Sequence, residues 1–166
     1  MTTPDLVDQL VGLAPGQPLH AVRHQREKVV QATQGSLEAL FDPALPGLPL
    51  SERLAVAVYA CRLTPAPELA TYYLAHLKEA GADAALLDTV QQDAPAATPR
   101  LAAIFEFTRK LIINPVEGDE AALKTLPEAG LSTPAVVALS QLIAFLSYQV
   151  RLVAGLKAIQ SLEQSA

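Results

Sequence analysis

The sequence has a single cysteine, no tryptophan and few charged residues. Charged side chains make up 17% of its 166 residues, against roughly 25% in a typical globular domain. With Cys61 alone, the chain cannot form an internal disulfide or run a redox cycle that needs two thiols. A lone cysteine fits a reducing compartment, and the first residues lack the positive and apolar regions of a secretory signal. We therefore expect a cytoplasmic protein.

Basic residues are also scarce. The net charge is −5 at pH 7, and the few lysines and arginines are scattered rather than clustered. Binding to nucleic acid or to an anionic membrane surface requires a concentrated basic patch. We therefore expect neither nucleic acid nor a membrane as a partner.

Apolar residues are abundant, at 51% of the chain. The stretch 129–150 carries no charge and is long enough to span a bilayer. It nevertheless contains Gly130, Pro134, Ser140, Gln141 and Gln149, which a lipid-facing helix would place in hydrocarbon. We expect instead a helix buried on most sides in a core or in an oligomer. With so few charges to cover the surface, we also expect a homo-oligomer.

Residues that favour helix starts and helix ends recur along the whole chain. Ser or Thr residues stand at expected helix starts, several of them before proline, and glycines follow apolar runs. This pattern predicts one all-α domain over residues 1–166. The expected helices are 4–13, 18–41 with a weak point at Gly35, 51–63, 67–80, 83–92, 98–113, 119–129 and 133–161. The helix 51–63 is apolar around nearly its whole circumference. Together with 133–161 it should form the centre of the fold or of the oligomer.

Three motifs in residues 48–158 point to a known family. They are Leu-Ser-Glu-Arg-Leu-Ala at 50–55, Glu-Ala-Gly-Leu-Ser at 128–132, and Arg-Leu-Val-Ala-Gly-Leu at 151–156, which ends a long helix. Their order and spacing resemble the alkylhydroperoxidase D-like superfamily, which includes carboxymuconolactone decarboxylases and peroxidase-related proteins. The resemblance implies a bundle of packed helices, assembly as a dimer, trimer or hexamer, and a peroxidase-related antioxidant function.

The redox motif of that superfamily is missing. Its redox-active members follow the helix-starting Glu with a Cys-x-x-Cys pair and a His, and only Glu52 matches. Counted from Glu52, the other positions hold Thr64, Pro67 and Thr71. We therefore expect acid–base chemistry on a small acid or lactone rather than dithiol chemistry. Two alternatives stay open: a peroxidase working through Cys61 alone, and a non-catalytic oligomer that binds a small molecule.

The catalytic candidates are Glu52, Cys61, Tyr72 and His76. Glu52 could donate or accept a proton in a dry pocket, although a carboxylate in a first helical turn also simply favours the helix dipole. Cys61 lies deep in an apolar helix without an evident activator, so a buried, inert thiol is the simpler interpretation. Tyr72, Tyr73 and His76 share one helix and could line a pocket, with Tyr73 as a substrate-binding residue, or could be packing residues.

Two further groups of residues could bind a ligand or a metal. Arg151 is the first charge after the neutral stretch and could extend to solvent, contact a substrate anion or form a buried ion pair. His20, His24 and Glu27 fall on one helix face at a spacing that could hold a metal. Their helix also carries several basic residues and looks like a solvated surface, and no third ligand can be identified. We therefore expect no metal and no cofactor.

Overall fold

The computed structural model describes residues 5–165 of the chain. Within this range the backbone forms nine α-helices and one 3₁₀ turn, and it forms no strand. The elements are α1 Leu6–Val11, α2 Pro18–His24, α3 Glu27–Leu40, α4 Leu50–Leu63, α5 Pro67–Glu79, α6 Ala84–Gln92, α7 Pro99–Ile113, η1 Pro115–Glu117, α8 Glu120–Glu128 and α9 Thr133–Ser165. The all-α prediction is therefore confirmed.

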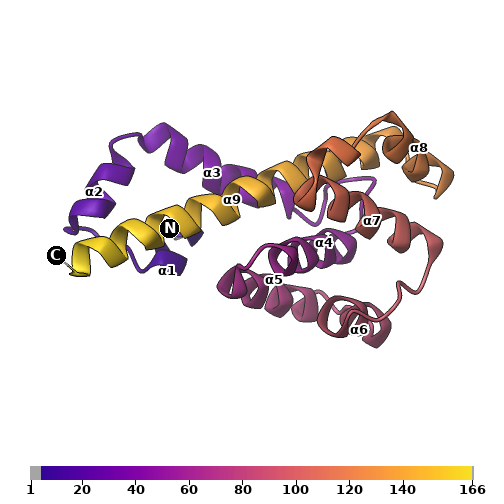
Figure 1. Cartoon of the computed structure of the whole chain (residues 1–166), viewed down its shortest axis with the longest axis horizontal. Helices are drawn as coiled ribbons and strands as arrows, with labels where there is room; N and C mark the ends of the chain where they lie inside the picture. Colours follow the sequence, from indigo (N-terminus) through magenta and orange to yellow (C-terminus); the bar gives the residue numbers. More distant parts are fainter. Residues whose placement is uncertain (1–4, 166) are drawn as a thin grey trace.

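The long helix α9 is the axis of the molecule. It runs along the longest dimension, with α1, α2 and α3 beside its C-terminal half and α4 to α8 grouped around its N-terminal half (Figure 1). The first described residues and the end of α9 lie at the same end of the molecule (Figure 1). Helices from opposite ends of the sequence are thus packed together, because α1 contacts α9 directly.

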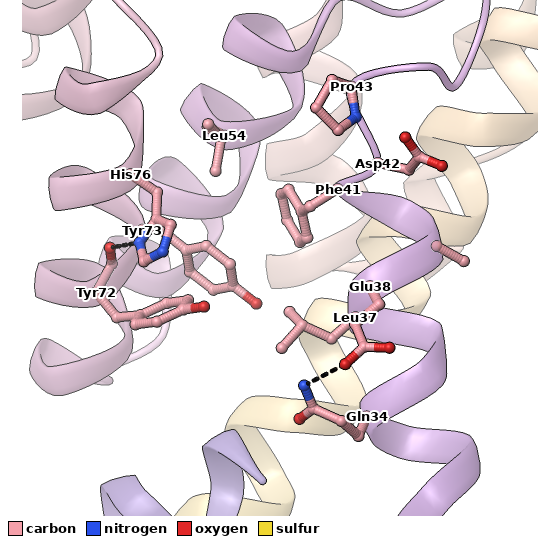
Figure 2. Close-up of a pocket in the computed structure, with 11 residues that line it drawn as sticks. Gln34, Leu37, Glu38, Phe41, Asp42, Pro43, Leu54, Tyr72, Tyr73 and His76 are labelled. Carbon is pink, nitrogen blue, oxygen red and sulfur yellow. Dashed lines mark hydrogen bonds between the residues drawn. The ribbon is translucent and has the colours of Figure 1, made fainter. Parts of the chain in front are cut away.

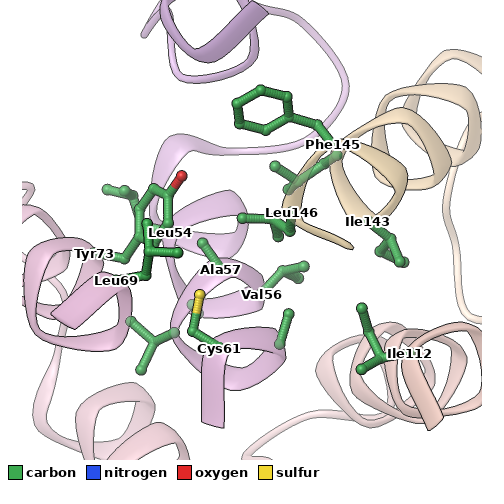
Figure 3. Packing of buried hydrophobic residues seen from close by; sticks show 14 of the residues in the cluster. Leu54, Val56, Ala57, Cys61, Leu69, Tyr73, Ile112, Ile143, Phe145 and Leu146 are labelled. Carbon is green, nitrogen blue, oxygen red and sulfur yellow. The ribbon is translucent and has the colours of Figure 1, made fainter. Parts of the chain in front are cut away.

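The helix α4 forms the centre of the packed core, as its uniformly apolar sequence predicted. It contacts α5, α6, α7 and α9, and Val56, Ala57 and Cys61 lie among apolar side chains of the neighbouring helices (Figure 3). A helix enclosed in this way needs no polar face. The two helices expected at the centre of the fold, α4 and α9, are in contact there.

Several helix ends lie one to four residues from their predicted positions, and one expected helix is divided in two. The expected helix 18–41 is two helices, broken at Gln25 and Arg26 rather than at Gly35. Arg26 adopts φ −111° and ψ 61°, outside the helical region, although no proline or glycine marks the break. The helix expected at 51–63 begins at Leu50, because the Arg53 amide already donates to the Pro49 carbonyl at 3.1 Å. Residue 4 of the first expected helix lies outside the described residues.

The apolar stretch that raised the question of a membrane lies in α9. The segment Thr133–Glu163 is long and apolar enough to cross a bilayer by length and composition, and 44% of its most apolar window is buried inside the chain. Core helices of soluble proteins pass the same test. The packing of α9 on α1, α3, α4, α7 and α8 gives part of its apolar surface a partner within the protein.

Candidate functional site

A cavity of about 480 Å³ lies between the C-terminal half of α3 and the middle of α5. The segment 41–43 and the side chain of Leu54 on α4 close it from one side (Figure 2). Its lining residues are Gln34, Leu37, Glu38, Ala39, Phe41, Asp42, Pro43, Leu54, Tyr72, Tyr73 and His76. The volume falls in the range of pockets that hold small molecules.

Aromatic rings form much of the cavity wall. The Phe41 ring lies 5.1 Å from the Tyr73 ring, and the Tyr72 ring meets Tyr73 edge-on at 5.2 Å, both measured between centroids. Leu37 and Leu54 add aliphatic surface. Such walls favour a flat, largely apolar molecule, because ring faces and edges pack against one another at these separations.

His76 presents one free ring nitrogen to this cavity. Its Nδ1 lies 2.9 Å from the backbone carbonyl oxygen of Tyr72. A carbonyl oxygen can only accept, so Nδ1 carries the proton, and in the neutral ring Nε2 is left as an acceptor. The Tyr72 ring packs on the imidazole at 4.2 Å and holds its orientation. A neutral imidazole fixed in one tautomer is a suitable proton acceptor.

The two tyrosines differ in what their hydroxyl groups can do. Tyr73 donates to Oε1 of Gln149 at 2.6 Å, and both residues are buried. Burial raises the pKa of Tyr73 well above its usual value of 10.0. Burial also raises the pKa of Tyr72, and the negative charge of Glu79 adds to the effect. Tyr72 therefore keeps its proton at neutral pH and can donate it to a bound molecule, whereas the Tyr73 hydroxyl is already engaged.

Two carboxylates lie on the wall opposite His76. Glu38 accepts from the Gln34 side-chain amide at 3.1 Å, and Asp42 accepts from the Ala44 amide at 2.8 Å. Sequence reasoning missed this wall altogether. In the sequence, the whole of α4 lies between two residues of this wall, Glu38 and Phe41, and His76 on α5. Nothing in their local pattern distinguishes Glu38 and Phe41 from surface residues at a helix end.

Arg53 holds that wall in place. Its guanidinium is fully buried and donates to the carbonyl oxygens of Leu48 at 2.9 Å, Leu40 at 2.5 Å and Asp42 at 3.0 Å. Three carbonyls of the segment 40–48 thus converge on one side chain of α4. Burial lowers the pKa of Arg53, and the charge of Asp42 partly offsets the effect. Burying this cation costs solvation free energy, and its hydrogen bonds to the three carbonyl oxygens offset that cost.

Gly47 lets the same segment pass close to α9. It adopts φ +88°, and an added Cβ would lie 3.1 Å from the backbone nitrogen of Ala135. Both the positive φ and the close approach disfavour any residue with a side chain. The segment 41–49 is therefore fixed at both sides, by Arg53 and by the contact with α9.

Glu52 lies outside the cavity and is engaged in an ion pair. Its two carboxylate oxygens accept from Nε and Nη2 of Arg100 on α7, at 2.9 and 3.0 Å. Arg100 also donates to the Gly130 carbonyl oxygen at 3.2 Å. Two-point pairing of this kind orients the carboxylate and ties α4 to α7. In this arrangement Glu52 joins helices and does not meet Tyr72 or His76.

Cys61 is likewise separate from the cavity. Its side chain is 1% exposed within the core of Figure 3, and burial raises the pKa of its thiol from 9.0 to about 12. The thiolate is the reactive form, so a thiol in this surrounding is inert at neutral pH. The interpretation of Cys61 as a buried thiol agrees with this geometry, and the one-thiol peroxidase finds no support in it.

The other residues named from the family motif also fall outside the cavity. Arg151 is exposed and donates to the Ser147 carbonyl oxygen of its own helix at 2.9 Å, which agrees with the alternative of a cation that reaches solvent and not with a buried ion pair. Thr64 and Thr71 donate back to helix carbonyls, and Pro67 starts α5. The turn between α4 and α5 therefore carries no thiol.

The fold is similar to that of a protein of known structure. A cysteine-to-alanine variant of the debrominase Bmp8, solved in complex with 2,3,4-tribromopyrrole, superposes with a TM-score of 0.69 and 14% sequence identity, covering 90% of this chain and 78% of that chain. This likeness confirms the alkylhydroperoxidase D-like helical fold. Neither a family model nor a curated protein sequence matches the chain.

Proposed function

We propose that this chain is a member of the alkylhydroperoxidase D-like superfamily that acts without a redox dithiol, by acid–base chemistry on a small ring compound. The ligand is a flat, largely apolar molecule with an acidic N–H or O–H group. It occupies the cavity between α3 and α5, and His76 is the proton acceptor. The observation that carries this proposal is the fixed tautomer of His76, whose Nδ1 proton is held by the Tyr72 carbonyl while Nε2 stays free.

The cavity offers a partner for each part of such a ligand. The ring packs between Phe41 and Tyr72, and its acidic hydrogen points at Nε2 of His76. When Nε2 takes the proton, the resulting imidazolium faces the side of the cavity that holds Glu38 and Asp42, and these charges favour it. The Tyr72 hydroxyl can donate to an acceptor on the ligand. The step needs no thiol and no external reductant.

The structural neighbour supports the class of ligand. The molecule bound to Bmp8 is a tribrominated pyrrole, which is a small, flat, mostly apolar ring with one acidic N–H. Debromination belongs to that protein and is not transferred with the fold. The alternative function is binding of such a compound without chemistry. It is favoured by the burial of Cys61, which leaves the cavity without a thiol nucleophile.

The test is calorimetric titration with 2,3,4-tribromopyrrole and with its N-methyl derivative. Wild type should bind the N–H compound at least about tenfold more tightly, which corresponds to one hydrogen bond to His76 of about 1.4 kcal/mol. His76→Leu should remove this preference, and Arg151→Ala serves as the control. Equal affinity for the two compounds in wild type would refute His76 as the acceptor. Product analysis by mass spectrometry then decides between turnover and binding alone.

Self-association, expected from the sequence, is also part of the proposal. A second hollow of about 420 Å³ lies between α2, α3 and α9, and large apolar side chains around it are open to solvent, among them Val22, Val29, Tyr148 and Ile159. Apolar surface of this kind favours an interface between copies of the chain. Light scattering at micromolar concentration should give a multiple of 17.6 kDa. The monomer mass would contradict the proposal.

A further inference from the structure

A second cluster of chemically active side chains joins α1 to α2. His20 and His24 lie one turn apart on α2, and Asp8 projects from α1 toward both of them. Their ligand atoms all lie within 4.8 Å of one another. None of the three lines the cavity of Figure 2, so this cluster is separate from the proposed function.

The two histidines present the same ring nitrogen to one carboxylate oxygen. Nε2 of His24 lies 2.8 Å from Oδ2 of Asp8, and Nε2 of His20 lies 3.9 Å from the same oxygen. The imidazole rings stack at 4.0 Å with an angle of 13° between their planes. Donor atoms of a tetrahedral zinc site, each about 2.0–2.2 Å from the metal, lie roughly 3.3–3.5 Å apart. The observed separations bracket that value, so small side-chain rotations suffice.

Hydrogen bonds within the described residues give His24 a partner but leave Nε2 of His20 without one. The side chain of His20 is only 17% exposed, and its Nε2 is beyond hydrogen-bond distance of Asp8. Nε2 of His24 lies between Asp8, which only accepts, and Arg23, whose Nη1 at 3.4 Å only donates. A single ring nitrogen cannot satisfy both neighbours. A cation that accepts lone pairs from both Nε2 atoms and from Oδ2 of Asp8 would give the Nε2 of His20 a partner, while Arg23 keeps its hydrogen bond to Oδ1 of Asp8.

The local charge balance favours a cation. Arg23 pairs with Oδ1 of Asp8 at 2.7 Å and with Asp5 at 3.0 Å, so that two carboxylates surround one guanidinium. The other oxygen of Asp5 is buried without a hydrogen-bond partner. Because Arg23 binds Oδ1, it leaves Oδ2 of Asp8 directed at the imidazoles and fixes its orientation, as outer-shell partners do in metal sites.

We propose that Asp8, His20 and His24 bind a divalent transition-metal ion of the zinc class. Two imidazoles and one carboxylate match the ligand preference of Zn²⁺ and leave a fourth position for water. The ion would join α1 to α2 and thereby hold the N-terminal segment against α9. The sequence alone could not reveal this site: Glu27, the partner expected on the histidine helix, starts a different helix.

The experiment is titration of the full chain with Zn²⁺, and with Co²⁺ for its absorption spectrum. Wild type should bind one equivalent, and Zn²⁺ should raise its melting temperature. His20→Gln and His24→Gln should each weaken binding more than about tenfold, the smallest effect that loss of even an outer-shell partner produces. His76→Gln is the matched control, because it removes the chain's remaining histidine, and it should bind Zn²⁺ like wild type.

Other outcomes would overturn the site. Stoichiometric binding that survives in a His20→Gln/His24→Gln double variant would place the ion elsewhere. A dissociation constant weaker than about 100 µM for wild type would mean that the cluster is only a polar contact between helices. Asp8→Asn tests the third ligand, but it also removes the ion pair with Arg23. Circular dichroism therefore first shows whether this variant folds. If it does not fold, the two single histidine variants decide the test.

Discussion

The core around α4 and the cavity beside α5 each contain a candidate catalytic residue, Cys61 and His76, in opposite surroundings. Cys61 is enclosed among apolar side chains with no cation or base in contact, and its thiol has a raised pKa. His76 has one nitrogen fixed by a carbonyl and the other open to a cavity. The thiol is therefore present but inaccessible, while His76, which does not fall at the histidine position of the redox motif, is available. Accessibility and a fixed proton, rather than residue type, distinguish the candidate site.

The largest expected effect tests the core side of this comparison. With the pKa of Cys61 raised from 9.0 to about 12, the thiolate fraction near pH 8 falls about 1,000-fold relative to the unfolded chain. Labelling by a disulfide reagent should slow by at least that factor in native protein and become fast in urea. Rapid labelling of the native protein would restore the one-thiol peroxidase as a candidate.

The same shift gives the pH dependence of stability. The folded-state pKa of Cys61 is higher than the unfolded value, so the stability that it contributes is complete below pH 9 and is lost as the pH rises toward about 12. Tyr73, whose pKa is also raised, acts in the same direction. Chemical denaturation of wild type and of Cys61→Ala across this range isolates the cysteine, and the variant should lose less stability.

Arg53 connects the two regions, and its removal should have the next largest effect. Arg53→Ala leaves three carbonyls of the segment 40–48 without their donor. At about 1–3 kcal/mol for each unsatisfied buried group, the free energy of unfolding should fall by at least about 3 kcal/mol. The exposed Arg151→Ala is the control and should change it by less than about 0.5 kcal/mol. Similar values for both in urea denaturation would show that the wall does not depend on Arg53.

A smaller effect separates the structural from the catalytic interpretation of Glu52. Arg100→Ala and Glu52→Gln break a partly buried pair, so each should lower the free energy of unfolding by about 1–2 kcal/mol. Neither should change the affinity for tribromopyrrole by more than about twofold, because the pair lies outside the cavity. Turnover that disappears in Glu52→Gln, with binding retained, would return Glu52 to the catalytic residues.

The smallest effect concerns the hydroxyl groups of the two tyrosines. Tyr73→Phe leaves Oε1 of the buried Gln149 without its donor and should cost about 1–2 kcal/mol of stability. Its ring stays in the cavity wall, so ligand affinity should hold. Tyr72→Phe is the reverse case: stability is kept and affinity falls if the phenol donates to the ligand. Equal behaviour of the two variants in both assays would contradict their different assignments.

The sequence predicted local features well and distant partnerships poorly. The uniformly apolar helix α4 and the isolation of Cys61 followed from periodicity and composition. The break at Gln25 and Arg26 had no local signal. Partners such as Arg100 for Glu52, or Asp8 for His24, depend on how separate helices meet, which periodicity does not encode. Arg53 illustrates the limit: in an apolar run it reads as a surface charge, yet folding places it where three carbonyls need a donor.

The contact between α1 and α9 has a consequence for how the chain acquires its structure. The helix α1 comprises Leu6–Val11, and its partner α9 begins at Thr133. During synthesis the first helix therefore emerges long before the surface that covers it, and an isolated helix of this length is not stable in water. The N-terminal segment can dock only after the last helix has been made, so closure of this contact across the whole sequence is a late event in folding.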